Sequence, residues 1–157
     1  MAENLSPNTS MTPLTYTVDE EHQPWVGGVR VLELAEKFGT PLYVLDEATI
    51  RAMAAAYRDV LIEDYPEQTL PLFACKANCN LALIKLVEQE GMGLDVVSGG
   101  ELYTTIQAGF PLERVFFNGN NKTVEELELA VHHQVGRISV DNFHELELLH
   151  KVAGNKN

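Results

Sequence analysis

One lysine stands where an apolar segment ends. Residues 70–76 read LPLFACK and are followed by the small and amide residues ANCN. If Lys76 shares a strand face with Leu72 and Ala74 and that face points into a barrel, its amine is partly desolvated, which lowers its pKa. Such an amine can form an imine with a carbonyl compound or carry a proton. Lys76 could equally extend from the strand end into solvent, and the pattern leaves both interpretations open.

Three later segments also resemble strands that end in polar residues. GLDVVS begins at Gly93, RVFFNG at Arg114 and RISVD at Arg137, so the strand starts from Leu70 onward are 23, 21 and 23 residues apart. Helical segments lie between and after them: LALIKLVEQE, GELYTTIQAG, TVEELELAVHHQ and FHELELLHKVA. Strands and helices that alternate at this spacing predict βα units around a parallel sheet.

Several of the expected helices begin with residues that can cap them. The capping-box pattern occurs as Thr123 with Glu126, as Ser98 with Glu101 and, more weakly, as Asn142 with Glu145. These pairs place the helix starts directly after the strand ends.

Two architectures are built from such units. A doubly wound nucleotide-binding sheet should carry a glycine-rich phosphate loop, and neither VSGGEL nor FNGNNK matches one. A (β/α)8 TIM-type barrel places its chemistry at the carboxyl ends of its strands. Those ends here hold Lys76 and Asn78, Asp95 and Ser98, Asn118 and Asn120, and Asp141 and Asn142. The pattern favours the α/β barrel class with parallel strands, of which about the first four βα units are present.

The sequence before Leu70 shows no such repeat of strands and helices. Residues 1–27 are polar and aperiodic, which predicts a flexible lead or a strand that needs a partner. Residues 28–39 predict a short helix that stops at Gly39, and residues 40–46 predict a strand. Asp46 can cap the next helix, whose predicted buried stripe consists of Ile50, Met53, Ala54, Tyr57, Val60 and Leu61.

Composition narrows the classes of partner and site. The 157 residues carry a net charge of −12 with no block of basic residues, which argues against nucleic acid and membrane surfaces as partners. Cys75 and Cys79 fit neither a disulfide framework nor a zinc site, and His132 and His133 lack further ligands, so no metal site is expected. The N-terminus resembles no secretion signal, and no apolar run is long enough to span a membrane. We therefore expect a cytoplasmic protein.

Longer stretches of the sequence resemble a known family. FACKANCNLALIKLVEQEG is similar to the cofactor-lysine segment of the alanine-racemase-like, barrel-type pyridoxal-phosphate enzymes, in their decarboxylase branch. GLDVVSGGELYTTIQAGFPLERVFFNGNNKTVEELELAV resembles the diaminopimelate decarboxylase family over nearly every residue, as do GTPLYVLDEATIR before it and ISVDNFHELELL after it. The resemblance covers residues 28 to 150 approximately.

The resemblance implies roles for four residues. Lys76 would hold pyridoxal 5'-phosphate as a Schiff base, and Asp95 would lie close to the cofactor. Ser98 and Glu101 would support this site from behind. The competing interpretations are a helix cap for Ser98 and Glu101 and a solvated turn residue for Asp95.

The implied activity is decarboxylation of meso-2,6-diaminopimelate, a small amino acid, to L-lysine and CO2 in lysine biosynthesis. An arginine or ornithine decarboxylase of the same family is the alternative within this class. A non-catalytic protein that binds pyridoxal phosphate, or an inert remnant in which Lys76 is an ordinary amine, would show the same motifs.

The resemblance also sets an expectation for domains. A complete barrel takes about 250 residues. We therefore expect residues 1–27 to be a lead and residues 28–157 to be the N-terminal half of the barrel. The second half of the barrel and the C-terminal β domain of the family, which works as a homodimer, would be absent. A chain of this extent is expected to be a fragment that is inactive alone.

Overall fold

The computed structural model describes residues 11–65 and 69–154. Contacts divide the chain into two compact units, Met1–Met53 and Ala54–Asn157. Residues 1–10 of the predicted lead and residues 155–157 at the end of the predicted half-barrel lie outside the described residues. No helix in the described ranges is both long and apolar enough to cross a membrane.

The first unit contains a small antiparallel sheet. Its strands are β1 (Thr17–Val18), β2 (Pro24–Val26) and β3 (Val29–Arg30), in the order β1-β2-β3. Val26 pairs with Val29, and the two-residue turn between them has φ of 60° at Gly27 and 75° at Gly28, as a tight hairpin turn requires. The sequence left a flexible lead and a strand that needs a partner as alternatives for residues 1–27. The described part of this segment contains paired strands.

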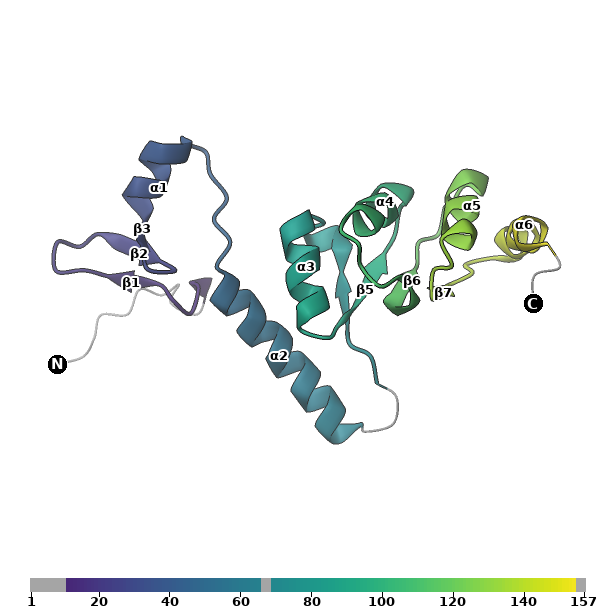
Figure 1. Cartoon of the computed structure of the whole chain (residues 1–157), viewed down its shortest axis with the longest axis horizontal. Helices are drawn as coiled ribbons and strands as arrows, with labels where there is room; N and C mark the ends of the chain where they lie inside the picture. The colour runs from purple at the N-terminus through teal and green to yellow at the C-terminus, as the bar shows by residue number, and fades with distance from the viewer. Residues whose placement is uncertain (1–10, 66–68, 155–157) are drawn as a thin grey trace. The chain divides into compact units, whose positions relative to one another are not determined.

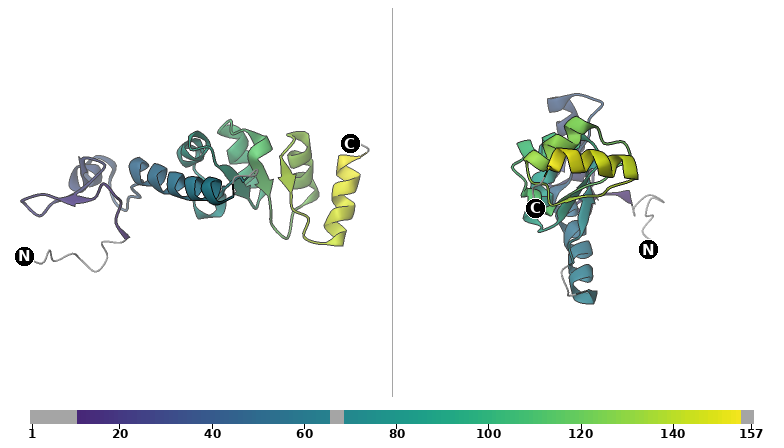
Figure 2. Two further views of the ribbon diagram at one scale, coloured as in Figure 1. Left: turned by 90° about the horizontal axis from the view of Figure 1, so that it is seen from below. Right: turned by 90° about the vertical axis from the view of Figure 1, so that its right-hand side faces the viewer.

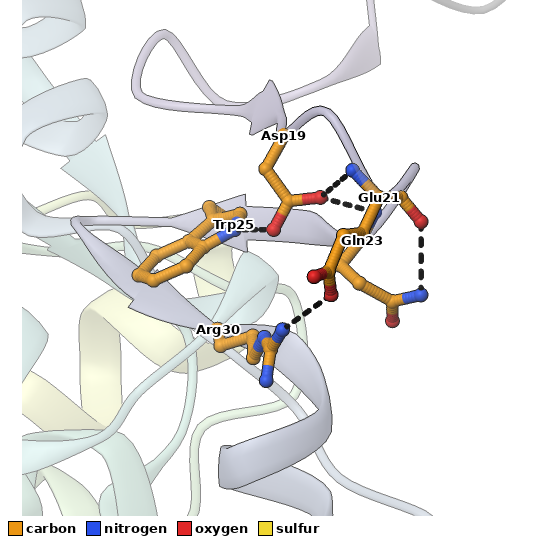
Figure 3. Close-up of polar contacts among 5 residues, drawn as sticks. All are labelled: Asp19, Glu21, Gln23, Trp25 and Arg30. Atoms are coloured by element: carbon orange, nitrogen blue, oxygen red, sulfur yellow. Dashed lines mark hydrogen bonds and ion pairs between the residues drawn. The ribbon is translucent and has the colours of Figure 1, made fainter.

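Asp19 organises the turn between β1 and β2. Its Oδ1 accepts hydrogen bonds from the backbone N–H groups of Glu21 (3.0 Å) and Gln23 (2.8 Å). Its Oδ2 accepts one from the Trp25 indole at 2.8 Å, as Figure 3 shows. One carboxylate thus holds both the turn and the side chain of the following strand.

Helix α1 (Val31–Phe38) follows, and the predicted stop at Gly39 is confirmed: its N–H donates to the carbonyl of Ala35, at a φ of 81°. The predicted strand over residues 40–46 is wrong. Residues 41–46 take no regular structure, and Tyr43 is 99% exposed. A strand needs a neighbour for its backbone groups, and the described residues provide none here.

Helix α2 (Glu47–Asp64) starts as predicted, because Oδ2 of Asp46 accepts the N–H of Thr49 at 3.0 Å. The predicted burial of its apolar stripe is wrong. Ala54 alone is buried, whereas Tyr57 is 69% and Val60 57% exposed. The 3.6-residue pattern predicts the helix correctly, but burial requires a covering element, which no described residues supply.

The second unit is a parallel α/β arrangement (Figure 1). Its sheet runs in the order β4 (Leu72–Ala74), β5 (Gly93–Val96), β6 (Val115–Phe117) and β7 (Arg137–Ile138). Each strand is followed by a helix: α3 (Leu81–Gln89), α4 (Gly99–Gln107), α5 (Val124–His132) and α6 (Phe143–Ala153). Two short 3-10 helices, η2 (Cys75–Ala77) and η3 (Leu112–Arg114), complete the unit.

The four helices form one layer. Consecutive helices contact one another, and Figures 1 and 2 show them following one another along the sheet. Sequential strand order with all helices on one face is the arrangement of a barrel and not of a doubly wound sheet, which confirms the predicted fold class. The core between sheet and helices contains fully buried side chains: Leu94, Val96, Val115, Phe117, Ile84, Leu102 and Leu127.

Candidate functional site

The carboxyl edge of the parallel sheet gathers the predicted site residues. Ala74, Asp95 and Phe116 lie side by side in the register of β4, β5 and β6. Leu94 and Val96 are fully buried toward the helices, so Asp95 between them lies on the opposite face. In a barrel this is the inner face, where a side chain at a strand end meets the ligand.

Lys76 lies just beyond this edge. The strand prediction for residues 70–76 is wrong in its last part, because β4 ends at Ala74 and Cys75–Ala77 form η2. Cys75 is buried at 1% exposure, whereas Lys76 is exposed. Of the two interpretations that the sequence leaves open for Lys76, the structure shows the exposed one, because the backbone turns into η2 after Ala74 and no described residue covers the lysine.

The backbone after Lys76 is fixed by two asparagines. Oδ1 of Asn78 accepts hydrogen bonds from the backbone N–H (3.3 Å) and the amide (2.9 Å) of Asn80. Oδ1 of Asn80 in turn accepts the N–H of Leu83 at 2.8 Å, so Asn80 caps α3. Lys76 thus stands between a strand end and a capped helix start, and both anchors limit the positions that its backbone can take.

Asp95 has a partner on the next strand. Nδ2 of Asn118, which directly follows β6, donates a hydrogen bond to Oδ1 of Asp95. No ion pair within 4 Å joins Asp95 to Lys76 in the described part of the chain, so the structure brings the two residues to the same edge without direct contact. The sequence placed Asn118 at a strand end but did not predict this contact.

Ser98 and Glu101 both serve the start of α4. Oγ of Ser98 accepts the N–H of Glu101 at 3.3 Å, as an N-cap does. Oε2 of Glu101 accepts the N–H of Val97 at 2.8 Å, one residue earlier than in a standard capping box. Both residues therefore act as caps at the start of α4. Through the N–H of Val97, the carboxylate of Glu101 also fixes the turn that follows Asp95.

Glu126 connects two neighbouring helix starts. Its Oε2 accepts the N–H of Thr123 (2.9 Å) and Thr123 Oγ1 accepts the N–H of Glu126, which confirms the predicted capping box of α5. Its Oε1 also accepts the N–H of Gly99 in α4 at 2.5 Å. A Cβ at position 99 would lie 2.8 Å from Cγ of Glu126, so glycine permits this approach.

A buried ion pair lies at the carboxyl edge of the sheet, beside the ends of β6 and β7. Nζ of Lys122 lies 2.8 Å from Oε1 of Glu145, with side chains 1% and 4% exposed. Lys122 also donates to the carbonyls of Gly119 and, at 2.9 Å, Ser139. Asn142 caps α6 through the N–H of Glu145, as predicted, while the Glu145 side chain turns to Lys122. Sequence reasoning missed Lys122 altogether.

The loops held by Lys122 line a polar pocket of about 350 Å³. Its lining consists of Asn118, Gly119, Asn120, Ser139, Val140 and Asp141. The pocket lies at the carboxyl ends of β6 and β7, where the sequence placed polar residues.

These residues fit a carbonyl cofactor held by a lysine. No hydrogen bond or ion pair joins the amine of Lys76 to another described residue, so the amine is available to react. Asp95 offers a carboxylate on the same edge, whereas the other lysine there, Lys122, is neutralised by Glu145. The described arrangement can therefore supply the covalent attachment point and one anionic partner of such a cofactor.

Comparison with known proteins agrees with this chemistry. Residues 47–157 match the family model described as pyridoxal-dependent decarboxylase, pyridoxal binding domain. The chain is 48% identical over 143 residues to the diaminopimelate decarboxylase of Bacillus methanolicus, covering 91% of this chain and 33% of the relative. It is 52% identical over 128 residues to that of Bacillus subtilis, covering 82% and 29%.

A solved structure gives the same result. The crystal structure of diaminopimelate decarboxylase from Methanocaldococcus jannaschii in complex with L-lysine superimposes with a TM-score of 0.79 at 35% identity, over 88% of this chain and 32% of that one. The chain thus spans about a third of the length of these relatives.

Proposed function

Because this chain belongs to the pyridoxal-dependent decarboxylases, we propose that it forms the lysine-bearing part of an enzyme that converts meso-2,6-diaminopimelate into L-lysine and CO2. The cofactor of this family is pyridoxal phosphate, and Lys76 is the residue that would hold it. The observation that carries the proposal is the exposed amine of Lys76, which has no partner among the described residues and lies two residues after Ala74, where Ala74 pairs with Asp95 at the carboxyl edge of the sheet.

The bound cofactor supplies the electron sink that accepts the electron pair left when CO2 departs. Lys76 would provide the amine that attaches the cofactor and that exchanges with the amino group of the substrate. Asp95 contributes negative charge near the cofactor. Ser98 and Glu101 stabilise this edge without contact to the cofactor, because their hydrogen bonds hold the turn after β5.

The remaining attributes belong to the same proposal. The relatives that match carry the name of a decarboxylase, and the proposal places the protein in the cytoplasm. The homodimer of the full-length family would apply to the whole protein. Residues that choose among diaminopimelate, arginine and ornithine are expected outside the part matched here. Residues 28–157 would contribute the N-terminal half of the cofactor-binding barrel.

The experiment that tests the proposal is a titration of the 157-residue chain with pyridoxal phosphate, followed by borohydride reduction and peptide mapping. An absorbance band of the lysine adduct, with label on Lys76 and none in Lys76→Ala, is the expected result. Lys85→Ala is the matched control, because Lys85 is an exposed lysine of α3 paired with Glu88 at 2.7 Å. Label spread evenly over several lysines, or no label, would contradict the assignment of Lys76.

Turnover is tested separately. Release of CO2 from diaminopimelate, with arginine and ornithine as competing substrates, requires the whole protein, of which this chain covers about a third by its relatives. Labelling at Lys76 without turnover by the chain alone agrees with the proposal. Preferred release of CO2 from arginine or ornithine by the whole protein would replace the proposed substrate.

A further inference from the structure

Asn118 is held in place by its own backbone and by the loop that follows it. Its N–H donates to the carbonyl of Val96 at 2.8 Å, which extends the ladder between β5 and β6 by one residue. Gly119 has a φ of 103°, and a Cβ there would lie 2.8 Å from the carbonyl oxygen of Val97. Only glycine allows the loop to run this close to the end of β5.

The other side of the loop is fixed as well. The carbonyl of Gly119 accepts a hydrogen bond from the buried amine of Lys122, which also binds the carbonyl of Ser139 at 2.9 Å. Asn118 therefore stands on a backbone that is anchored before and after it. A side chain on such a support keeps its orientation at little entropic cost when it binds a partner.

The partner is Asp95. Nδ2 of Asn118 donates to Oδ1 of Asp95, and within residues 11–65 and 69–154 no second side chain donates to this carboxylate. One carboxylate oxygen is consequently fixed across the strands, while the other is left without a donor. The contact also sets the rotation of the carboxylate, because a side-chain amide prefers a linear hydrogen bond near the carboxylate plane.

We propose that Asn118 is a positioning residue, which orients the carboxylate of Asp95 so that its second oxygen is available to the cofactor attached at Lys76. The inference rests on the proposed function and deepens it. It assigns to the end of β6 a part in the cofactor site that neither its sequence motif nor the family match specifies.

The test compares three variants of the full chain. Asn118→Ala removes the contact. Asn121→Ala is the control, an exposed asparagine of the same loop that lies outside the polar pocket. The double variant D95N/N118D restores an amide–carboxylate pair but moves the charge to the neighbouring strand. For each, the apparent Kd for pyridoxal phosphate, the fraction of borohydride-fixed label on Lys76 and the urea midpoint are measured.

We expect N118A to weaken cofactor binding by roughly three- to tenfold, the range for one lost hydrogen bond, while N121A matches the parent chain. The double variant should recover the urea midpoint but not the labelling of Lys76, because the charge is misplaced. Equal binding by N118A and N121A, or recovery of labelling in the double variant, would overturn the positioning role. Absence of Lys76 labelling in the parent chain would overturn the proposed function first and this role with it.

Discussion

The amine of Lys122 and the carboxylate of Glu145 meet 2.8 Å apart on side chains that are 1% and 4% exposed. Lys122 extends from the loop after β6, and Glu145 lies in the first turn of α6. The pair therefore ties the loop after β6 to the helix of the next βα unit. Both charges are removed from water, so removal of either partner would leave the other charge buried and unpaired, at a large cost in free energy.

We predict that Glu145→Ala lowers the free energy of unfolding by about 3 kcal/mol, since it leaves the Lys122 charge buried and uncompensated. Urea unfolding followed by circular dichroism measures the change. The control is Lys85→Ala, which breaks the exposed Lys85–Glu88 pair (2.7 Å) and should cost no more than about 0.5 kcal/mol. Similar losses from both variants would show that burial does not govern the Lys122 pair.

Glu126 provides a second link between neighbouring units. Glu126→Ala removes the acceptors of the Gly99 and Thr123 N–H groups, and we predict a loss of about 2 kcal/mol in unfolding free energy. Glu128→Ala, two residues further along α5 and exposed, should stay within about 0.5 kcal/mol of the parent chain. The same urea experiment decides. A Glu126→Ala variant as stable as Glu128→Ala would mean that neither hydrogen bond contributes.

Local signals predicted most of the second unit. Helix α6 begins and ends at the predicted residues 143 and 153, because its cap, Asn142, directly precedes it and its apolar period fills the segment. The capping box of Thr123 and Glu126 was equally readable. Four strand–helix alternations then sufficed for the parallel sheet, since right-handed connections leave little choice of topology.

Two of the failures concern partners that the local sequence does not contain, and the third concerns the residue at which a strand ends. Residues 40–46 have the composition of a strand but no neighbouring strand among the described residues. The stripe of α2 has the right period but no cover, so Tyr57 stays exposed. Lys76 was placed in a strand because the apolar run continues through Cys75, whereas the backbone turns into η2 after Ala74.

The missed site contacts share a spacing that the sequence did show. Asn118 lies 23 residues after Asp95, and Glu145 lies 23 residues after Lys122. Asp95 itself pairs in register with Phe116, 21 residues on, so Asn118 lies two residues past the matching position. Lys122 precedes the N-cap of α5, whereas Glu145 lies in the first turn of α6. The repeat therefore assigns each pair to consecutive βα units, but it does not single out the partner residues.

The two cysteines should differ in reactivity. Burial raises the pKa of the Cys75 thiol strongly, and burial also raises the pKa of the half-buried Cys79 thiol. Since the thiolate is the reactive form, we predict that iodoacetamide at pH 8 alkylates Cys79 at least about tenfold faster than Cys75 in the folded chain. Mass spectrometry of quenched samples measures both rates.

The chain unfolded in urea is the control for the alkylation rates, because the two thiols should react at similar rates in the unfolded state. Faster alkylation of Cys75 in the folded chain would contradict the burial of its side chain at the start of η2.

The last prediction concerns the first unit and its dependence on pH. Hydrogen bonds from the Trp25 indole and then from the backbone N–H of Gln23 lower the pKa of Asp19 below its ordinary value. A carboxyl group with a lowered pKa in the folded state stabilises that state at neutral pH, and the stabilisation is lost as the pH falls through the folded pKa. Trp25 is the only tryptophan of the chain, so its fluorescence reports this contact.

We therefore expect Trp25 fluorescence to be constant from neutral pH down to about pH 4 and to change with a midpoint below about 3.9, the ordinary value for aspartate. Asp19→Ala should remove this transition, because the indole then has no carboxylate acceptor. Glu20→Gln, a change at an exposed neighbour in the same turn, should leave it in place. A midpoint at or above the ordinary value in the parent chain, or an unchanged transition in Asp19→Ala, would show that Asp19 is not the group that holds Trp25.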